Sequence, residues 1–329
     1  MLQLISKKDT SALYKINGQI GGKVDRYILT TPETRAICNN PRVLGMEYTR
    51  KLQKGCEFAL KSLVNDAALI LNETETIVFN ILRGGLNFGL RDSLADAFNW
   101  NAHSSSFISA QRRRCENNPD EWEIVEGDYH KLYLKPISSI VFGDVVATGT
   151  SLEHGLEILI DEVIRSESQI RNMTFFTIGG IRTEEILEKA GQRLSQICPD
   201  FEGISLIYIE GCFVVPTAET PLHIKITGTD LIKRDALMAP EFIESQYESP
   251  YYPLERCTIY DAGSRAFLVP EYAEDLCDYW KEVLELAKNR MNFKMLVEER
   301  TPFLESDRFA DENLVLMAQS QVDFFEKYI

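Results

Sequence analysis

The chain lacks the features that would place it in a membrane or outside the cell. Its apolar runs fall well short of the roughly 18 residues that a membrane span needs, and residues 1–8 (MLQLISKK) lack the order of a secretion signal. Its seven cysteines are scattered, odd in number and without a Cys-x-x-Cys pair, so neither a disulfide framework nor a zinc site is predicted. We therefore expect a cytoplasmic protein with no membrane partner.

Histidine is also scarce, and basic residues are outnumbered by acidic ones. The four histidines show no metal-ligand spacing and no recognisable nucleophilic triad. The formal net charge of −15 disfavours nucleic acid as a partner, because phosphates would be repelled over most of the surface. Residues 18–24 (GQIGGKV) are one residue short of a nucleoside triphosphate loop and lack its Ser or Thr. Small anionic substrates, bound at a locally basic loop, remain compatible with this composition.

What is present is an alternation of strand-like and helix-like segments. Helical patterns are predicted over residues 45–64, 86–98, 151–166 and 183–196, and strands over residues 76–82, 104–108, 138–143, 173–178 and 204–210. Such alternation predicts an α/β protein with a parallel sheet covered on both faces. Ligands of these sheets bind beyond the carboxyl ends of the strands.

Three regions follow from this pattern. Residues 45–215 form the expected α/β core, preceded by a segment over residues 1–44 that is a candidate hood. From residue 216 onward, prolines punctuate an irregular stretch before two helical segments near 271–297 and 310–327. We expect this 216–329 extension to build a base pocket, a dimer interface or both.

A strand-turn-helix segment at residues 138–152 carries the strongest functional signal. An apolar strand ends at Asp144, and residues 147–151 (ATGTS) form a hydroxyl-rich turn before a helix. The free N–H groups at a helix start bind anions, and the hydroxyls of the turn add donors. Gly149 permits a positive φ or a close backbone approach. The segment predicts a phosphate site in which Asp144 holds sugar hydroxyls.

A second strand-turn-helix segment lies earlier in the chain. The strand over residues 75–82 runs into Arg83, Gly84 and Gly85 before an amphipathic helix. Two glycines let the backbone fold around an oxyanion, and a guanidinium gives charge-assisted hydrogen bonds. The alternative is a plain turn with a surface arginine. Two such loops at one edge of a sheet favour the phosphate interpretation.

Between these segments runs a polar tract over residues 109–120 (SAQRRRCENNPD), without helical or strand periodicity. A long loop in a compact domain is usually disordered or functional. Arg112, Arg113 and Arg114 are candidates for contacting an anionic substrate, whereas the alternative is a solvated charged face.

Residues 141–151 (VFGDVVATGTS) resemble the 5-phosphoribosyl 1-pyrophosphate (PRPP) motif of type I phosphoribosyltransferases. That motif has four apolar residues, two acids, two apolar residues and a turn such as ATGGT. This chain departs from it at Gly143, where the first acid usually stands, and at Thr150, where a second glycine is common. Residues 81–86 (ILRGGL) are also similar to the ILRAGL segment of uracil phosphoribosyltransferases.

The resemblance implies a phosphoribosyltransferase-like parallel sheet flanked by helices, with a hood and a largely helical C-terminal extension. It implies PRPP and a nucleobase as substrates, Mg²⁺ as cofactor, and a homodimer. Arg83 and Asp144 would be catalytic, with Asp144 near the metal through water or ribose hydroxyls. The substrate-binding residues would be Gly84, Gly85, Arg112, Arg113, Val145, Val146, Ala147, Thr148, Gly149, Thr150 and Ser151.

One phrase in the extension is similar to the GDAGDRLF base-site signature of uracil phosphoribosyltransferases. It is residues 260–267 (YDAGSRAF), in which Asp261 and Gly263 would contact the base. The alternative is a turn before a short strand. Its distance from Asp144 is longer than we expect for that enzyme, so the base stays unassigned.

Two other functions remain open. Gly143 in place of an acid favours a non-catalytic regulator that binds PRPP or a nucleotide, because affinity can survive a change that abolishes turnover. An unrelated α/β enzyme acting on another sugar phosphate is the third alternative.

Overall fold

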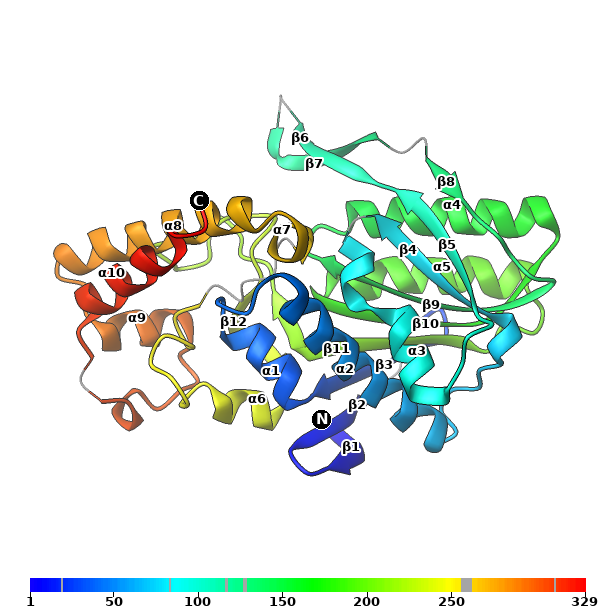
Figure 1. Ribbon diagram of the computed structural model, residues 1–329, viewed down its shortest axis with the longest axis horizontal. Coiled ribbons are helices and arrows are strands. Elements are labelled where there is room, and N and C mark those ends of the chain that lie inside the picture. Colours follow the sequence, from blue (N-terminus) through cyan, green and yellow to red (C-terminus); the bar gives the residue numbers. More distant parts are fainter. Residues whose placement is uncertain (19, 83, 116–117, 127–128, 256–261, 311) are drawn as a thin grey trace.

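The structure, a computed structural model, describes residues 1–329 except 19, 83, 116–117, 127–128, 256–261 and 311. For residues 111–115, 118–123, 125–126, 262 and 263 it describes the backbone alone. The chain forms a large mixed sheet flanked by helices, which confirms the expected α/β class (Figure 1).

The strands are β1 (Leu2–Lys8), β2 (Ser11–Ile16), β3 (Val24–Thr30), β4 (Thr76–Leu82), β5 (Ser104–Ser109), β6 (Gln111–Cys115), β7 (Asn118–Glu126), β8 (His130–Lys131), β9 (Ile137–Val146), β10 (Gln169–Gly180), β11 (Gly203–Val214) and β12 (Ile232–Met238). The helices are α1 (Pro32–Asn39), α2 (Gly45–Asn65), α3 (Leu90–Phe98), α4 (Thr150–Ser166), α5 (Arg182–Ile197), α6 (Pro240–Ser245), α7 (Ala262–Phe267), α8 (Val269–Lys288), α9 (Phe293–Arg300) and α10 (Leu314–Phe325). Short 3₁₀ turns are η1 (Glu73–Glu75), η2 (Gly84–Phe88) and η3 (Ser306–Arg308).

The main sheet reverses its strand order between β4 and β9. Its order is β1-β2-β3-β11-β10-β9-β4-β5-β8, with β12 paired to β11. The strands from β5 through β4, β9, β10 and β11 to β3 are parallel, whereas β1, β2, β8 and β12 pair in the antiparallel sense. From β4 the chain moves outward to β5 and then returns to the other side of β4 as β9. The crevice at such a reversal, outside the carboxyl ends of the strands, is where ligands bind in open α/β sheets.

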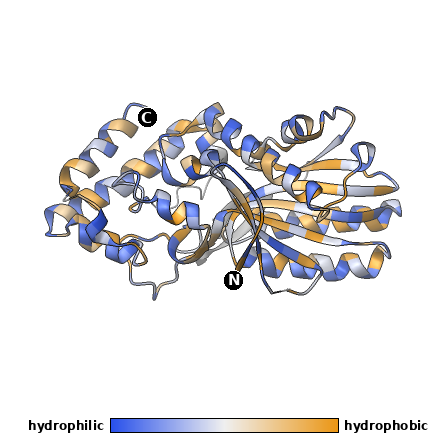
Figure 2. Ribbon diagram, turned by 90° about the horizontal axis from the view of Figure 1, so that it is seen from below, coloured by the Kyte–Doolittle hydropathy of each residue, from blue (hydrophilic) through white to orange (hydrophobic). Residues whose placement is uncertain are grey.

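Helices cover both faces of this sheet. α4 and α5 pack together on one face, and α1, α2 and α3 lie on the other (Figure 1). Strands between two helical layers are buried on both sides, and the residues of β4 and β9 are accordingly mostly apolar and buried. Figure 2 shows these mainly apolar strands between the helices. In the part of the chain that the structure describes, every helix is too short or too polar to cross a membrane.

The elements expected between residues 45 and 210 are confirmed, with two differences. The helix expected from residue 86 begins at Leu90, because η2 occupies Gly84–Phe88 and Gly89 takes a left-handed φ of 58°. The tract expected as a loop over residues 109–120 is wrong in part. It contributes β6 and β7, a hairpin that projects from the body and contacts α4 (Figure 1). Its register pairs Arg113 with Glu123, and Ile124 of β7 packs against the main core. The apolar residues of β7 lie after residue 120, beyond the polar tract.

The terminal regions adjoin the core in different ways. The segment expected as a candidate hood, residues 1–44, extends the sheet through β1, β2 and β3 and adds α1. The main hydrophobic core runs from Leu13 to Phe242 and therefore includes residues beyond 216. A separate core, from Leu254 to Val322, joins α8, α9 and α10, which lie together beside the sheet (Figure 1).

Arg265 of α7 ties the C-terminal region to α1. Its guanidinium is fully buried and donates from Nε to the Val43 carbonyl at 2.7 Å. The two terminal nitrogens donate to the carbonyls of Ile37 at 3.0 Å and Asn40 at 2.7 Å. The last carbonyls of a helix lack partners inside the helix and attract cations, so Arg265 caps the end of α1.

Candidate functional site

Two loops meet at the reversal between β4 and β9. The loop after β4 holds Gly84 in the η2 turn, and β9 carries Asp144 near its end. A β-carbon added to Gly84 would lie 2.8 Å from Asp144 Oδ1, so only a glycine fits beside this carboxylate without a shift. Gly85 is equally close to β9, since its added β-carbon would lie 3.0 Å from the Gly143 carbonyl oxygen. The structure thus brings together the two segments that the sequence singled out.

Asp144 is held in a fixed orientation at this crevice. Its residue surface is 9% exposed, and the backbone N–H of Val145 donates to Oδ1 at 2.9 Å. Val145 and Val146 are the last residues of β9 and place the following turn beyond the carboxyl edge of the sheet. A carboxylate fixed in this way accepts hydrogen bonds from hydroxyl groups that enter the crevice.

The turn after β9 leads directly into α4. Gly149 has a φ of 82° and occupies the N-cap position, and α4 begins at Thr150, one residue before the expected 151. No side chain caps this helix start. Thr148 Oγ1 lies 3.2 Å from Thr150 Oγ1, so their hydroxyls adjoin the uncapped N–H groups. Ser151 differs, because its hydroxyl donates to the Ala110 carbonyl at 3.3 Å. The N–H groups at a helix start without a side-chain cap are suited to binding an anion, and adjacent hydroxyls add donors.

Gly143 stands where the resemblance leads one to expect an acid, and Phe88 explains why none fits. A β-carbon on Gly143 would lie 2.6 Å from the Phe88 ring, which is fully buried. Phe88 ends the η2 turn, so the loop that approaches Asp144 also fills the space of the missing side chain. The Phe88 ring therefore occupies the space that the side chain of an acid at position 143 would need.

The structure does not describe the side chains of the other predicted site residues. Arg83 and Asp261 lie outside the described residues, and Arg112 and Arg113 lie in β6, where the structure describes the backbone alone. Gly263 lies in α7, which contacts η2 and α2. The segment after Asp261 is thus a helix, not the turn and short strand that formed the alternative interpretation.

A pocket of about 550 Å³ opens beside the turn after β9, and sequence reasoning missed it. Ala147 and Thr148 form one wall, and the rest of the lining comes from β2, β3, the ends of β10 and β11, β12 and the start of α5. Within the lining, Arg26 forms an ion pair with Glu184 at 2.9 Å. Part of this wall could have been predicted from the sequence. The strands predicted at 173–178 and 204–210 end at the same edge of the sheet, so the residues that directly follow them are expected to lie together there.

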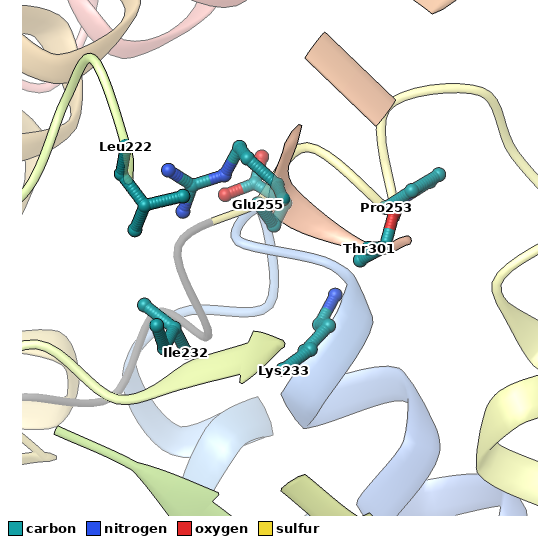
Figure 3. A pocket seen from close by; sticks show the side chains of 7 residues that line it. Leu222, Ile232, Lys233, Pro253, Glu255 and Thr301 are labelled. Carbon is teal, nitrogen blue, oxygen red and sulfur yellow. The ribbon is translucent and has the colours of Figure 1, made fainter. Parts of the chain in front are cut away.

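A second polar pocket, in the C-terminal region, is not a ligand site. It is lined by Leu222, Ile232, Lys233, Pro253, Glu255, Arg300 and Thr301 (Figure 3). Lys233 Nζ donates to Gln246 Oε1 at 2.8 Å, and the pocket has essentially no room for even a water molecule. The Lys233 ammonium thus joins β12 to Gln246 at the end of α6 and to the Tyr252 carbonyl.

Comparisons with known proteins give no further guidance. No family model matches the chain, and no curated protein is significantly similar to it.

Glu210, near the end of β11, is a buried acid that serves the fold. Burial raises its pKa from 4.5 to about 8, although the Thr34 hydroxyl donates to Oε1 and opposes the shift. Oε2 is buried without a hydrogen-bond partner in the described part of the chain. The backbone of Glu210 is left-handed, with a φ of 64°, which turns the acid toward α1. The folded protein therefore keeps this carboxyl protonated at neutral pH.

We expect Glu210→Gln to remove a pH dependence of stability. Because the folded-state pKa is raised, the stabilisation is fully present below pH 4.5 and is lost as the pH rises through about 8. The variant should nearly match the wild type at pH 5 and exceed its unfolding free energy at pH 9 by on the order of 5 kcal/mol, given about 1.4 kcal/mol per pKa unit. Urea unfolding at both pH values measures this. Glu167→Gln is the control, because Glu167 has a φ of 54° but is exposed.

Proposed function

We propose that the protein is a phosphoribosyltransferase, which transfers the 5-phosphoribosyl group from PRPP to a nitrogen of a heterocyclic base and releases pyrophosphate. The observation that carries the proposal is the approach of Gly84 to Asp144 at the strand reversal, beside the uncapped start of α4. A glycine backbone suited to pyrophosphate, a carboxylate suited to ribose hydroxyls and a helix start suited to a phosphate lie at one edge of one sheet. The proposal includes a type I phosphoribosyltransferase-like fold and a homodimer.

The substrate would lie across this edge in one orientation. The 5′-phosphate would bind the N–H groups and hydroxyls of residues 147–151, Asp144 would accept hydrogen bonds from ribose hydroxyls, and the backbone of Gly84 and Gly85 would hold pyrophosphate. Arg83 is proposed to neutralise the leaving group. The base nitrogen attacks the anomeric carbon as the bond to pyrophosphate breaks, so the protein positions the reactants and stabilises developing charge.

The donor groups at the crevice fit a magnesium ion that takes most of its ligands from the substrate. The described residues contain no group of three or more His, Cys, Asp and Glu side chains that would hold a metal by themselves. Mg²⁺ commonly keeps waters and phosphate oxygens and uses one or two carboxylates. Asp144 is the carboxylate that would lie near it. When bound with PRPP, the metal would neutralise charge on the departing pyrophosphate.

The hairpin of β6 and β7 supports a role for Arg112 and Arg113 as a cover over the substrate. It contacts α4, whose first turn carries the proposed phosphate site. A cover that excludes water strengthens the electrostatic interactions inside a site.

A second function, a non-catalytic PRPP-binding regulator, is favoured by the packing of Phe88 against Gly143. A ring in place of a carboxylate leaves phosphate contacts intact but removes one hydrogen-bond acceptor from the crevice.

Calorimetry with PRPP, with and without Mg²⁺, followed by an assay of released pyrophosphate in the presence of nucleobases, tests the proposal. Phosphoribosyl transfer predicts magnesium-dependent binding and base-dependent release. Binding without release for any base would favour the regulator. Absence of PRPP binding would contradict both.

A further inference from the structure

We infer that the pocket beside the turn after β9 binds the acceptor, and that this acceptor is an uncharged ring compound rather than a carboxylate. The inference rests on the proposed function and names the substrate class of that site. Ala147 and Thr148 belong both to the proposed phosphate turn and to the pocket wall, so a ring in the pocket would lie next to the bound PRPP, on the side of its 5′-phosphate. A volume of about 550 Å³ is enough for a small heterocycle and within the usual range for ligand pockets.

The walls that would contact the ring are mainly apolar. Phe213 lies near the end of β11, Val215 follows that strand, and Ile181 follows β10. Ile181 is 60% exposed and Leu237 is 41% exposed, so two large apolar side chains flank the pocket in contact with solvent. A flat ring with apolar faces would cover them and remove that surface from water.

The charges in the lining are already paired. Arg26 donates from one terminal nitrogen to Glu184 at 2.9 Å and from the other to the Gly18 carbonyl at 2.7 Å. Glu184 also accepts from the Tyr208 hydroxyl at 3.3 Å. The Arg26 and Glu184 side chains are only 15% and 8% exposed, so an entering ligand would have to break a largely buried pair to reach either charge.

The second guanidinium in the lining is paired as well. Arg182 donates to Glu185 at 2.6 Å and to Glu153 at 3.4 Å. Asp235 adds a negative charge, 79% exposed, near Arg234. The described lining thus holds Arg26, Arg182, Glu184 and Asp235, two charges of each sign. The Arg26 Nε is buried and has no hydrogen-bond partner among the described residues, but the guanidinium is already held by Glu184. A carboxylate that entered would lose its hydration and would have to compete with these ion pairs for a cation, which is costly.

Matched acceptor pairs test the inference on the full-length chain with Mg²⁺ and PRPP. Uracil and orotate differ by a carboxylate, and nicotinamide and nicotinate differ by an amide in place of a carboxylate. In whichever of these pairs the enzyme accepts as substrates, we expect kcat/KM for pyrophosphate release to be at least 100-fold higher for the neutral member than for the carboxylate. An equal or higher value for the carboxylate would overturn the inference and leave the phosphoribosyl transfer standing.

Leu237→Arg, with Leu237→Met as its control, locates the effect in this pocket. The added cation should shift the ratio of neutral to carboxylated acceptor at least tenfold toward the carboxylate, whereas the methionine should leave the ratio unchanged. An arginine that leaves the ratio unchanged would contradict the pocket assignment.

Should no acceptor release pyrophosphate, the proposed transfer fails and binding decides the inference separately. Calorimetry on the PRPP-loaded chain should then show a neutral ring binding more tightly than its carboxylated partner, with the preference weakened by Leu237→Arg. Binding of neither member at millimolar concentration, or tighter binding of the carboxylate, would overturn the inference.

Discussion

Asp144→Asn should lower the rate of pyrophosphate release by at least about 100-fold, the size of effect expected when a buried, preorganised electrostatic contact is removed. The substitution keeps the shape of the side chain, and its oxygen still accepts from the Val145 N–H that now lies 2.9 Å from Oδ1. What it removes is the negative charge beside Gly84, where the proposed ribose and metal would bind. Steady-state kinetics with saturating PRPP measures the loss in kcat.

Asp161→Asn is the matched control, because Asp161 lies in α4 with its side chain 74% exposed. It should leave kcat and KM unchanged. Urea unfolding should show both variants as stable as the wild type, so that a loss of rate for Asp144→Asn is not a loss of fold. Equal rates for Asp144→Asn and the wild type would remove the carboxylate from the proposed mechanism.

The central elements of the fold were predictable because burial makes their sequences distinctive. β4 and β9 lie between two helical layers, so almost every position is buried and the strands appear as apolar runs. β1 is an edge strand whose residues Leu2–Lys8 are partly or fully exposed, and its polar, charged sequence carries no such signal. The β6–β7 hairpin was missed for another reason, since the tract over residues 109–120 is polar and the apolar residues of β7, such as Ile124, lie beyond it.

The candidate site was predictable only where its residues are consecutive. The two loops at the strand reversal are local motifs, and their approach follows from the rule that parallel strands end at one edge. The pocket beside them brings together Ile16, Arg26, Glu184, Phe213 and Leu237 from separate elements, and no local pattern records that. Gly143 shows the same limit. The sequence reveals that the acid is missing, but it does not reveal that the Phe88 ring, which belongs to another loop, fills the space beside Gly143.

The packing of Arg265 also shows how a motif changes meaning in three dimensions. The sequence of residues 260–267 resembles a base-binding signature, and its alternative interpretation is a turn. Its arginine instead lies fully buried over the end of α1, with its guanidinium 4.8 Å from the centre of the Tyr48 ring and 5.5 Å from that of Tyr272. Because Arg265 donates hydrogen bonds to backbone carbonyls of another segment, the fold requires it, whatever the neighbouring residues bind.

Arg265→Met should therefore destabilise the protein by about 5 kcal/mol, since each buried acceptor left unsatisfied costs roughly 1–3 kcal/mol. The methionine keeps much of the side-chain volume but leaves the carbonyls of Ile37, Asn40 and Val43 without the three bonds they receive from the guanidinium. Urea unfolding followed by circular dichroism measures the loss. Arg165→Met is the control, because the Arg165 side chain is 75% exposed and paired only within its own helix, and its midpoint should match the wild type.

The same variant distinguishes a structural anchor from a base contact. If Arg265 acts only by holding α7 and the C-terminal helices against α1, conditions that keep the variant folded, such as low temperature, should preserve the KM for the base. The cost then appears in the unfolding midpoint alone. A KM for the base that rises at least tenfold in the folded variant, with an unchanged midpoint, would instead place this segment at the base site. The buried geometry of the guanidinium predicts the first result, because its donors are already bonded to the carbonyls of Val43, Ile37 and Asn40, and Arg265 does not line the pocket that adjoins Thr148.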